Sequence, residues 1–366
     1  MNYTLTRRGA MGAILGAIAA GGHAWAQGLA ATDGLTQEQT EDMQKLIEGA
    51  RKEGAVSYWD TVIQPATNDE LAAAFRKYYG LPDSFKVNYT LSGTSNLITR
   101  VEQELSANNI SIDVASIASP PWTIERVKAG DIVEYHAPQY KHYKQIFDAG
   151  LGMDGYFAFN GGYIFVPMWN SDEVDFKGTS YKDVIDAVEK GRISCGDVMK
   201  SSSYLATYIG QKQVLPKEFF EKLAAMKPAF IVRSEQIASS IVSGEYKMAF
   251  SGMPTRAYQY NQKGANLKFM LPDEGVVLMP QNTFVLRGAP HPNAAKLLLN
   301  FVLSDEAQTI LAKREALISG RTGFDSPLPD YSPSIEKLKL IKVDWESMST
   351  EALRKARDEW ERMFNP

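Results

Sequence analysis

The sequence has little that would support a metal site, a disulfide framework or nucleophilic catalysis. It has one cysteine, Cys195, among 366 residues, so no intramolecular disulfide can form, and a small buried thiol is the simplest interpretation. Beyond residue 100 the histidines are His136, His142 and His291, without the i, i+4 pair or the Cys/His spacing of a zinc site. No G-x-S-x-G sequence occurs. We therefore expect no catalytic residue, no metal ligand and no cofactor.

Basic residues are not in excess either. The chain has 39 Lys and Arg against 43 Asp and Glu, a net charge of −4, so we expect no nucleic-acid partner. Its content of 44% hydrophobic and 22% charged residues is typical of a soluble globular protein, and its length predicts about two domains. No apolar run reaches the roughly 20 residues that a membrane-spanning helix needs.

The N-terminus has the pattern of an export signal. Arg7 and Arg8 precede an apolar run at 10–20, and Ala24-Trp25-Ala26 is a small-x-small cleavage sequence. The paired arginines indicate twin-arginine export. A retained anchor is the alternative, which the short apolar run disfavours. We expect residues 1–26 to be a signal peptide cleaved after Ala26, and the mature protein to be periplasmic.

Strand and helix patterns alternate along the chain. Residues 56–59 and 112–117 read as short strands, and 85–91 shows the period-2 alternation of a strand, with helical patterns between them. An apolar run at 163–169 reads as one long strand leading into a second unit with the same rhythm. The pattern predicts an α/β fold of open, mainly parallel sheets flanked by helices on both faces, with the functional site at the carboxyl ends of the strands.

One motif match is set aside. Residues 150–155 fit G-x-G-x-x-G, a dinucleotide-binding pattern, but they follow a polar helical stretch instead of a strand and lead into Tyr and Phe instead of a helix. We interpret them as a loop between the two units.

Polar and aromatic side chains gather where the predicted strands end, or follow shortly after. Because these ends line the crevice of an open α/β sheet, we take such residues as candidate ligand contacts. The candidates are Trp59, Asp60, Thr61, Ser92, Gly93, Thr94, Ser95, Ser116, Ser119, Trp122, Ser203, Tyr204, Glu235, Met253, Arg256, Tyr258 and Glu274.

The segment 92–95 is the most informative of these clusters. Gly93 lets a ligand approach the backbone, and the helix that follows offers free N–H groups and a positive dipole to an anion. The alternative is that Thr94 or Ser95 only caps that helix. Elsewhere, Trp59 could stack on a ligand ring, and we expect Thr94→Ala or Trp59→Ala to weaken ligand binding at least tenfold, about 1.4 kcal/mol.

Two further candidates each have a competing interpretation. Trp122 could stack on a ligand ring or belong to the core. Arg256, with Tyr258 close by, could clamp a carboxylate or a phosphate, or could be an ordinary surface arginine.

In order and spacing, several short stretches resemble the periplasmic solute-binding proteins of ATP-binding-cassette (ABC) importers. The likeness is to the branch with iron(III), phosphonate, sugar-phosphate and polyamine receptors. The stretches are 46–56, 92–95, 100–104, 113–114, 243–245, 271–275, 289–296 and, beyond them, Phe301, Leu303, Ser304, Glu306, Ala307 and Gln308.

The resemblance implies the two-lobed periplasmic-binding-protein type 2 fold, with a ligand cleft between the lobes. We expect lobe 1 at 27–158, lobe 2 at 159–275, a return to lobe 1 at 276–320, and a C-terminal helical segment at 321–366 that packs on lobe 2. The implied role is capture of a small solute for an ABC permease in the inner membrane, without catalysis. We expect a monomer.

The ligand itself stays open at this point. Ser, Thr and backbone N–H groups suit an anionic organic solute such as a carboxylate, a phosphonate or a sugar phosphate, whereas Asp60, Glu235 and Glu274 suit an amine or a zwitterion. Ferric members of the branch use adjacent tyrosines, but Tyr258 and Tyr260 are separated by one residue. Ferric iron and polyamines remain alternatives, as do a secreted hydrolase and a periplasmic sensor module.

Overall fold

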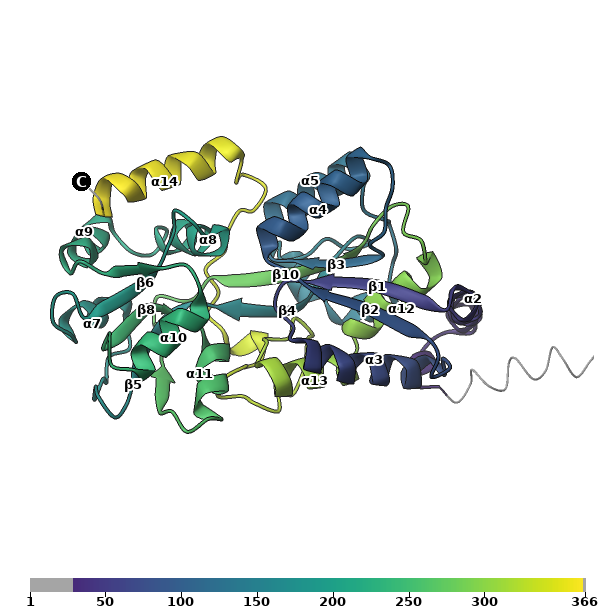
Figure 1. Cartoon of the computed structure of the whole chain (residues 1–366), viewed down its shortest axis with the longest axis horizontal. Coiled ribbons are helices and arrows are strands. Elements are labelled where there is room, and N and C mark those ends of the chain that lie inside the picture. The colour runs from purple at the N-terminus through teal and green to yellow at the C-terminus, as the bar shows by residue number, and fades with distance from the viewer. Residues whose placement is uncertain (1–28, 365–366) are drawn as a thin grey trace, which may run out of the picture.

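The computed structural model describes residues 29–364, which form two lobes side by side (Figure 1). The expected signal peptide lies outside the described residues. Each lobe is built on a five-stranded mixed sheet, and helices lie against both sheets. The predicted α/β, two-lobed fold is confirmed.

The first sheet has the strand order β2-β1-β3-β10-β4. Strands β1, β2 and β3 run parallel, and β10 runs antiparallel to both β3 and β4. The strand bounds are β1 (Ala55–Asp60), β2 (Lys86–Leu91), β3 (Val114–Ile117), β4 (Ala158–Ile164) and β10 (Leu278–Val285). The three parallel strands therefore end at one edge, which faces the second lobe.

The second sheet has the order β7-β6-β8-β5-β9. Here β6, β7 and β8 run parallel, and β5 is antiparallel to β8 and β9. The bounds are β5 (Val166–Asn170), β6 (Ile193–Gly196), β7 (Ala229–Ile231), β8 (Met248–Gly252) and β9 (Leu267–Phe269). In each sheet four strands therefore run in one direction, and one strand, β10 in the first sheet and β5 in the second, runs against them.

The apolar run at 163–169 is two strands instead of the single one expected. Only Phe165 separates β4, in the first sheet, from β5, in the second. This run therefore crosses between the lobes within one residue. The sequence hides the break because both strands are buried almost throughout, so no polar residue interrupts the run.

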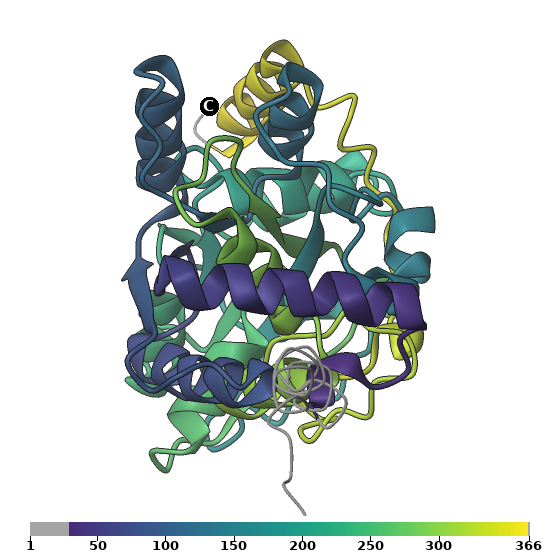
Figure 2. The same ribbon diagram turned by 90° about the vertical axis from the view of Figure 1, so that its right-hand side faces the viewer.

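Helices pack on both faces of the first sheet. Figure 1 shows α4 and α5 on one side of it and α3 and α12 on the other, and Figure 2 shows α2 running across the end of that lobe. The helix bounds are η1 (Ala30–Thr32), α2 (Gln37–Glu53), α3 (Pro65–Tyr79), α4 (Thr94–Ser106), α5 (Pro120–Ala129), η2 (Pro138–His142), α6 (Lys144–Asp148), α7 (Tyr181–Asp186), α8 (Ser202–Gln211), α9 (Lys217–Ala225), α10 (Ser234–Val242), α11 (Pro254–Asn261), α12 (Pro292–Val302), α13 (Asp305–Glu315), η3 (Ile335–Lys337) and α14 (Thr350–Phe364).

Local sequence accounts for where several helices begin and end. At α2, the side chains of Thr36 and Gln39 form a capping box, and Gly54 ends the helix in the left-handed region at φ 72°. At the C-terminus, α14 packs against α8 and α9, and the ring of its Trp360 lies edge-on against Tyr208 of α8 and Phe230 of β7, at centroid distances of 4.8 and 5.7 Å. These aromatic contacts hold the C-terminal helix on the second lobe.

Cys195 lies on β6 with 0% of its surface exposed, and burial raises the pKa of its thiol far above the ordinary value. A protonated, inaccessible thiol is a poor nucleophile. We predict that Ellman's reagent at pH 8 labels no thiol in the native protein and one thiol per chain in 6 M guanidinium chloride. Rapid labelling without denaturant would contradict this placement.

Candidate ligand-binding cleft

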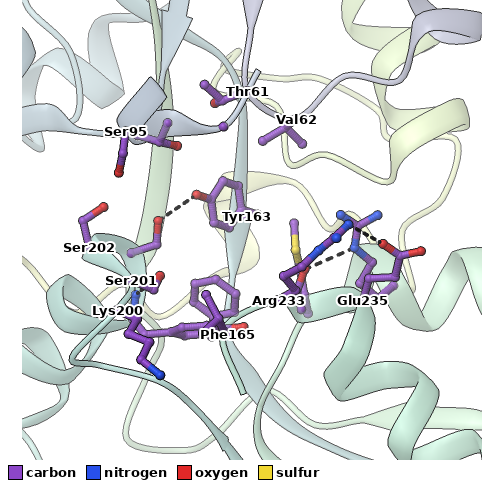
Figure 3. Close-up of a pocket in the computed structure, with 18 of the residues that line it drawn as sticks. Thr61, Val62, Ser95, Tyr163, Phe165, Lys200, Ser201, Ser202, Arg233 and Glu235 are labelled. Carbon is purple, nitrogen blue, oxygen red and sulfur yellow. Dashed lines mark hydrogen bonds and ion pairs between the residues drawn. The ribbon is translucent and has the colours of Figure 1, made fainter. Parts of the chain in front are cut away.

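A cavity of about 390 Å³ lies between the lobes. Thr61, Val62 and Ser95 face it from the first lobe, and Lys200, Ser201 and Arg233 face it from the second (Figure 3). The cavity falls within the size range of small-molecule sites. It is lined by about half of the candidates that the sequence indicates, namely Thr61, Gly93, Thr94, Ser95, Ser203, Tyr204, Glu235, Met253 and Arg256.

Four helices begin at this cleft: α4 from the first lobe, and α8, α10 and α11 from the second. Only α8 has a side-chain cap, in which Ser201 accepts a hydrogen bond from the backbone N–H of Tyr204. The N-cap residues of the others are Gly93, Arg233 and Met253, which make no side-chain cap bond. At the starts of α4 and α10, backbone N–H groups therefore remain available to an anion, and the helix dipoles favour negative charge there. At α11, by contrast, Pro254 has no N–H, and the N–H of Arg256 bonds to the carbonyl of Met253 at 2.8 Å.

The structure does not show Thr94 or Ser95 capping α4, which was the alternative to ligand contact. Thr94 is the first helical residue and Gly93 the N-cap, so neither Thr94 nor Ser95 closes the helix end. Thr94 is half-buried and Ser95 is exposed at the cavity wall. Both hydroxyls lie where a ligand can reach them.

Cationic side chains outnumber acidic ones around the cavity. Lys200 is 3.7 Å from Asp197, and Arg233 donates to Glu235 at 3.1 Å. The half-buried Arg256 has no carboxylate partner in the described part of the chain. Its guanidinium is held by Ser234 at 3.2 Å and by Gln259 at 2.6 Å. Arg256 is thus a positioned cation whose charge is not neutralised by the protein.

Hydroxyl groups complete the lining. Tyr163 and Ser203 hydrogen-bond to each other at 3.2 Å, while the hydroxyls of Thr61 and Tyr204 are buried without a hydrogen-bond partner in residues 29–364. Burial raises the pKa of both Tyr163 and Tyr204. They therefore stay protonated at neutral pH and can donate to a bound anion.

The structure places Asp60 and Ser116 behind the cleft instead of in it. Both are fully buried in a polar cluster in which Tyr58 donates to Asp60 at 2.9 Å and Asn160 donates to Asp60 at 3.2 Å. Asp60 also accepts from the backbone of Val62 at 2.7 Å. This cluster holds the loop after β1. Asp60 and Ser116 are therefore positioning residues and not the ligand contacts expected from the sequence.

The other candidates outside the cavity make contacts elsewhere. Trp122 donates to Glu102 at 2.9 Å and lines, together with Ser119, a second cavity. Tyr258 donates to the carbonyl of Lys313. Trp59 and Ser92 are half-buried and do not line the cleft, so the expected loss of affinity in Trp59→Ala has no contact to explain it.

Glu274 is also outside the cleft. It accepts hydrogen bonds from the hydroxyl of Ser180 and, at 3.2 Å, from the backbone of Tyr181, so it fixes the start of α7. Glu274 and Asp60, two of the three acidic candidates that favoured an amine ligand, therefore do not line the cleft.

The sequence candidates missed Tyr163, Phe165, Lys200 and Arg233, which line the cleft. Lys200 and Arg233 each lie within a few residues of a named candidate, so extending the strand-end clusters by a few positions would have included them. Tyr163 and Phe165 had no such signal, because their apolar run reads as a buried strand. In residues 29–364 no group of three or more His, Cys, Asp or Glu is placed to hold a metal ion, and no helix there is long and apolar enough to cross a membrane.

The family of this chain follows from comparison with known proteins. Residues 70–339 match the family model of the bacterial extracellular solute-binding proteins. Because the match spans more than half of the sequence, the chain belongs to that family. An uncharacterized protein of Haemophilus influenzae is 27% identical over 187 residues, which are 48% of this chain and 52% of the relative. The chain thus spans about half the length of the curated relative it matches.

Solved structures share the fold at low identity. Iron-bound HitA from Pseudomonas aeruginosa has a TM-score of 0.66 at 18% identity, covering 84% of this chain and 99% of its own. AfuA from Actinobacillus pleuropneumoniae, with fructose-6-phosphate bound, has a TM-score of 0.67 at 19% identity over 85% and 98%. An ABC-transporter substrate-binding protein from Agrobacterium tumefaciens reaches 0.71 at 13% over 85% and 94%. At these identities the likeness establishes the fold alone.

Proposed function

We propose that this protein captures a small organic anion in the interlobe cleft and presents it to an ABC permease of the inner membrane. The observation that carries the proposal is the convergence of four helix N-termini and the unpaired Arg256 on one cavity. Backbone N–H groups, a bidentate guanidinium and protonated hydroxyls are the donors that recognise carboxylate, phosphonate or phosphate groups. We also propose that the N-terminal signal delivers the protein to the periplasm and that the protein is a monomer. The lobes are proposed to have the boundaries expected from the sequence.

The lining disfavours the cationic alternatives. Three basic residues, Lys200, Arg233 and Arg256, line the cavity together with one acid, Glu235. A polyamine would be repelled by this balance of charge, and ferric iron would find no cluster of anionic oxygen ligands. Among the similar structures, HitA has iron bound and AfuA has fructose-6-phosphate bound. Of these two ligands, the charge of this cleft favours the sugar phosphate.

Matched pairs of ligands test the charge of the cargo. In a thermal-unfolding assay at pH 7, fructose 6-phosphate is compared with fructose, and phosphonates and dicarboxylates with their neutral parents. A ligand at a hundred times its Kd stabilises the native state by about 2.7 kcal/mol, so at least one anion is expected to raise Tm by several degrees while its neutral parent does not. Stabilisation by spermidine or Fe³⁺ alone would refute the proposal.

We predict that Thr94→Ala weakens binding of the identified anion at least tenfold, because it removes a hydroxyl from the first turn of α4 at the cavity wall. Thr99→Ala is the matched control, since Thr99 lies on the same helix, is exposed, and bonds only to the carbonyl of Ser95. Titration calorimetry measures both. Equal affinity in the two variants would remove the start of α4 from the site.

A further inference from the structure

A second cavity of about 230 Å³ adjoins the cleft. It shares Ser202 with the cleft, at the start of α8. The same two helices, α4 and α8, contribute to both cavities. Thr94 and Tyr204 line the cleft, and Ile98 and Ala206, further along these helices, line the second cavity. The second cavity therefore lies beside the cleft, and we call it the side chamber.

The walls of this side chamber are mainly apolar and come from both lobes. Pro120, Pro121 and Trp122 at the start of α5 face it from the first lobe, and Met348 and Leu353 from the segment around the start of α14 face it from the second. A group bound here would be enclosed by both lobes, as a solute in the cleft would be. A cavity of about 150 Å³ already accommodates a benzene ring in an apolar protein interior. The chamber is therefore large enough for a phenyl ring or a short alkyl chain and too small for a segment of another protein.

One polar atom in the walls lacks a partner. Trp345 lines the chamber with only 3% of its surface exposed, and its indole Nε1 makes no hydrogen bond within residues 29–364. A buried indole N–H usually finds an acceptor, and leaving it unpaired is costly. Because this N–H is itself buried, it presents no donor to the chamber, and Trp345 offers a guest only the apolar part of its ring.

We infer that the cargo is an amphipathic organic anion, whose charged head binds at the helix N-termini of the cleft and whose apolar body occupies the side chamber. The inference rests on the proposed function and narrows the substrate class from any small anion to phosphonates, phosphate esters or carboxylates that carry an aryl or alkyl group. Trp122, which the sequence indicated as a stacking residue, then contributes to binding in the chamber instead of in the cleft.

Two short ligand series test this by titration calorimetry: methylphosphonate, propylphosphonate and phenylphosphonate, with acetate, butyrate and benzoate beside them. Each buried methylene is worth about fourfold in affinity. The affinity is therefore expected to rise at least tenfold from the first to the last member of the series that binds. Equal affinity along that series would overturn the inference while leaving the anion site intact.

Variants that fill the chamber supply the control. Ile98→Phe and Leu353→Phe enlarge half-buried side chains on opposite walls, and neither residue lines the cleft. In both variants, we expect the longest ligand to bind no more tightly than the shortest. The shortest ligand should keep its wild-type affinity, which also shows that the variants fold. Unchanged affinity for the long ligand in both variants would exclude the chamber. If no member of either series binds to the wild-type protein, the proposed function fails, and this inference fails with it.

Discussion

Arg256→Gln is expected to weaken binding of the preferred anion by about 10- to 150-fold. The guanidinium lies at the cleft, has no carboxylate partner in the described residues, and is oriented by Ser234 and Gln259. A hydrogen bond to a charged group is worth about 1.5 to 3 kcal/mol, and glutamine keeps a similar length without the charge. Titration calorimetry on the purified variant measures the loss of affinity directly.

Arg314→Gln is the matched control for this experiment. Arg314 pairs with Glu70 at 2.7 Å on the surface of α13, with 60% of its side chain exposed, and it does not line the cleft. Its replacement removes the same charge from the protein and is expected to leave affinity unchanged. If the two variants bind the anion equally well, Arg256 is an ordinary surface arginine, as the competing interpretation of the sequence holds.

Asp60→Ala is expected to lower the free energy of unfolding by about 2 to 4 kcal/mol. The buried carboxylate accepts from Tyr58, Asn160 and the backbone of Val62 and Ile63. Truncation leaves the backbone N–H groups of Val62 and Ile63 without this acceptor, whereas Tyr58 and Asn160 keep Ser116 and each other as partners. Each orphaned group costs roughly 1 to 3 kcal/mol before the structure relaxes. Urea unfolding followed by tryptophan fluorescence gives the free energy.

The comparison variant is Asp42→Ala, in which the carboxylate lost is exposed and pairs with Lys45 at 2.8 Å on the surface of α2. An exposed pair of this kind contributes about 0 to 1 kcal/mol. Because Asp60 also fixes the loop that carries Thr61, its replacement should reduce ligand affinity as well. An Asp60→Ala protein as stable as the Asp42→Ala protein would show that the polar cluster behind the cleft is not structural.

The sequence predicted the fold well because its signals are local. Period-2 alternation at 85–91 marked β2, and the short strand patterns at 56–59 and 112–117 marked β1 and β3. The break between β4 and β5 escaped because it depends on which sheet each strand joins. Strand pairing is decided by contacts far apart in the sequence, and an unbroken apolar run carries no mark of it.

The candidate site was predictable in position but not in side-chain direction. The rule that ligands bind at the carboxyl ends of strands located Thr61, Thr94 and Arg256 at the cleft. It equally selected Asp60, which points into the buried polar cluster, and Trp122, which turns toward Glu102 and the side chamber. Successive residues at a strand end face opposite ways, so choosing among them requires the packing of the whole lobe.

Native mass spectrometry of the freshly purified protein, repeated after denaturation, identifies the chemical class of the solute in the cleft. The comparison gives the mass of any molecule that the protein retains from its host and releases on unfolding. We expect an organic anion that carries a phosphate, phosphonate or carboxylate group, with an aryl or alkyl body that fills the side chamber. Release of iron or of a polyamine would contradict it.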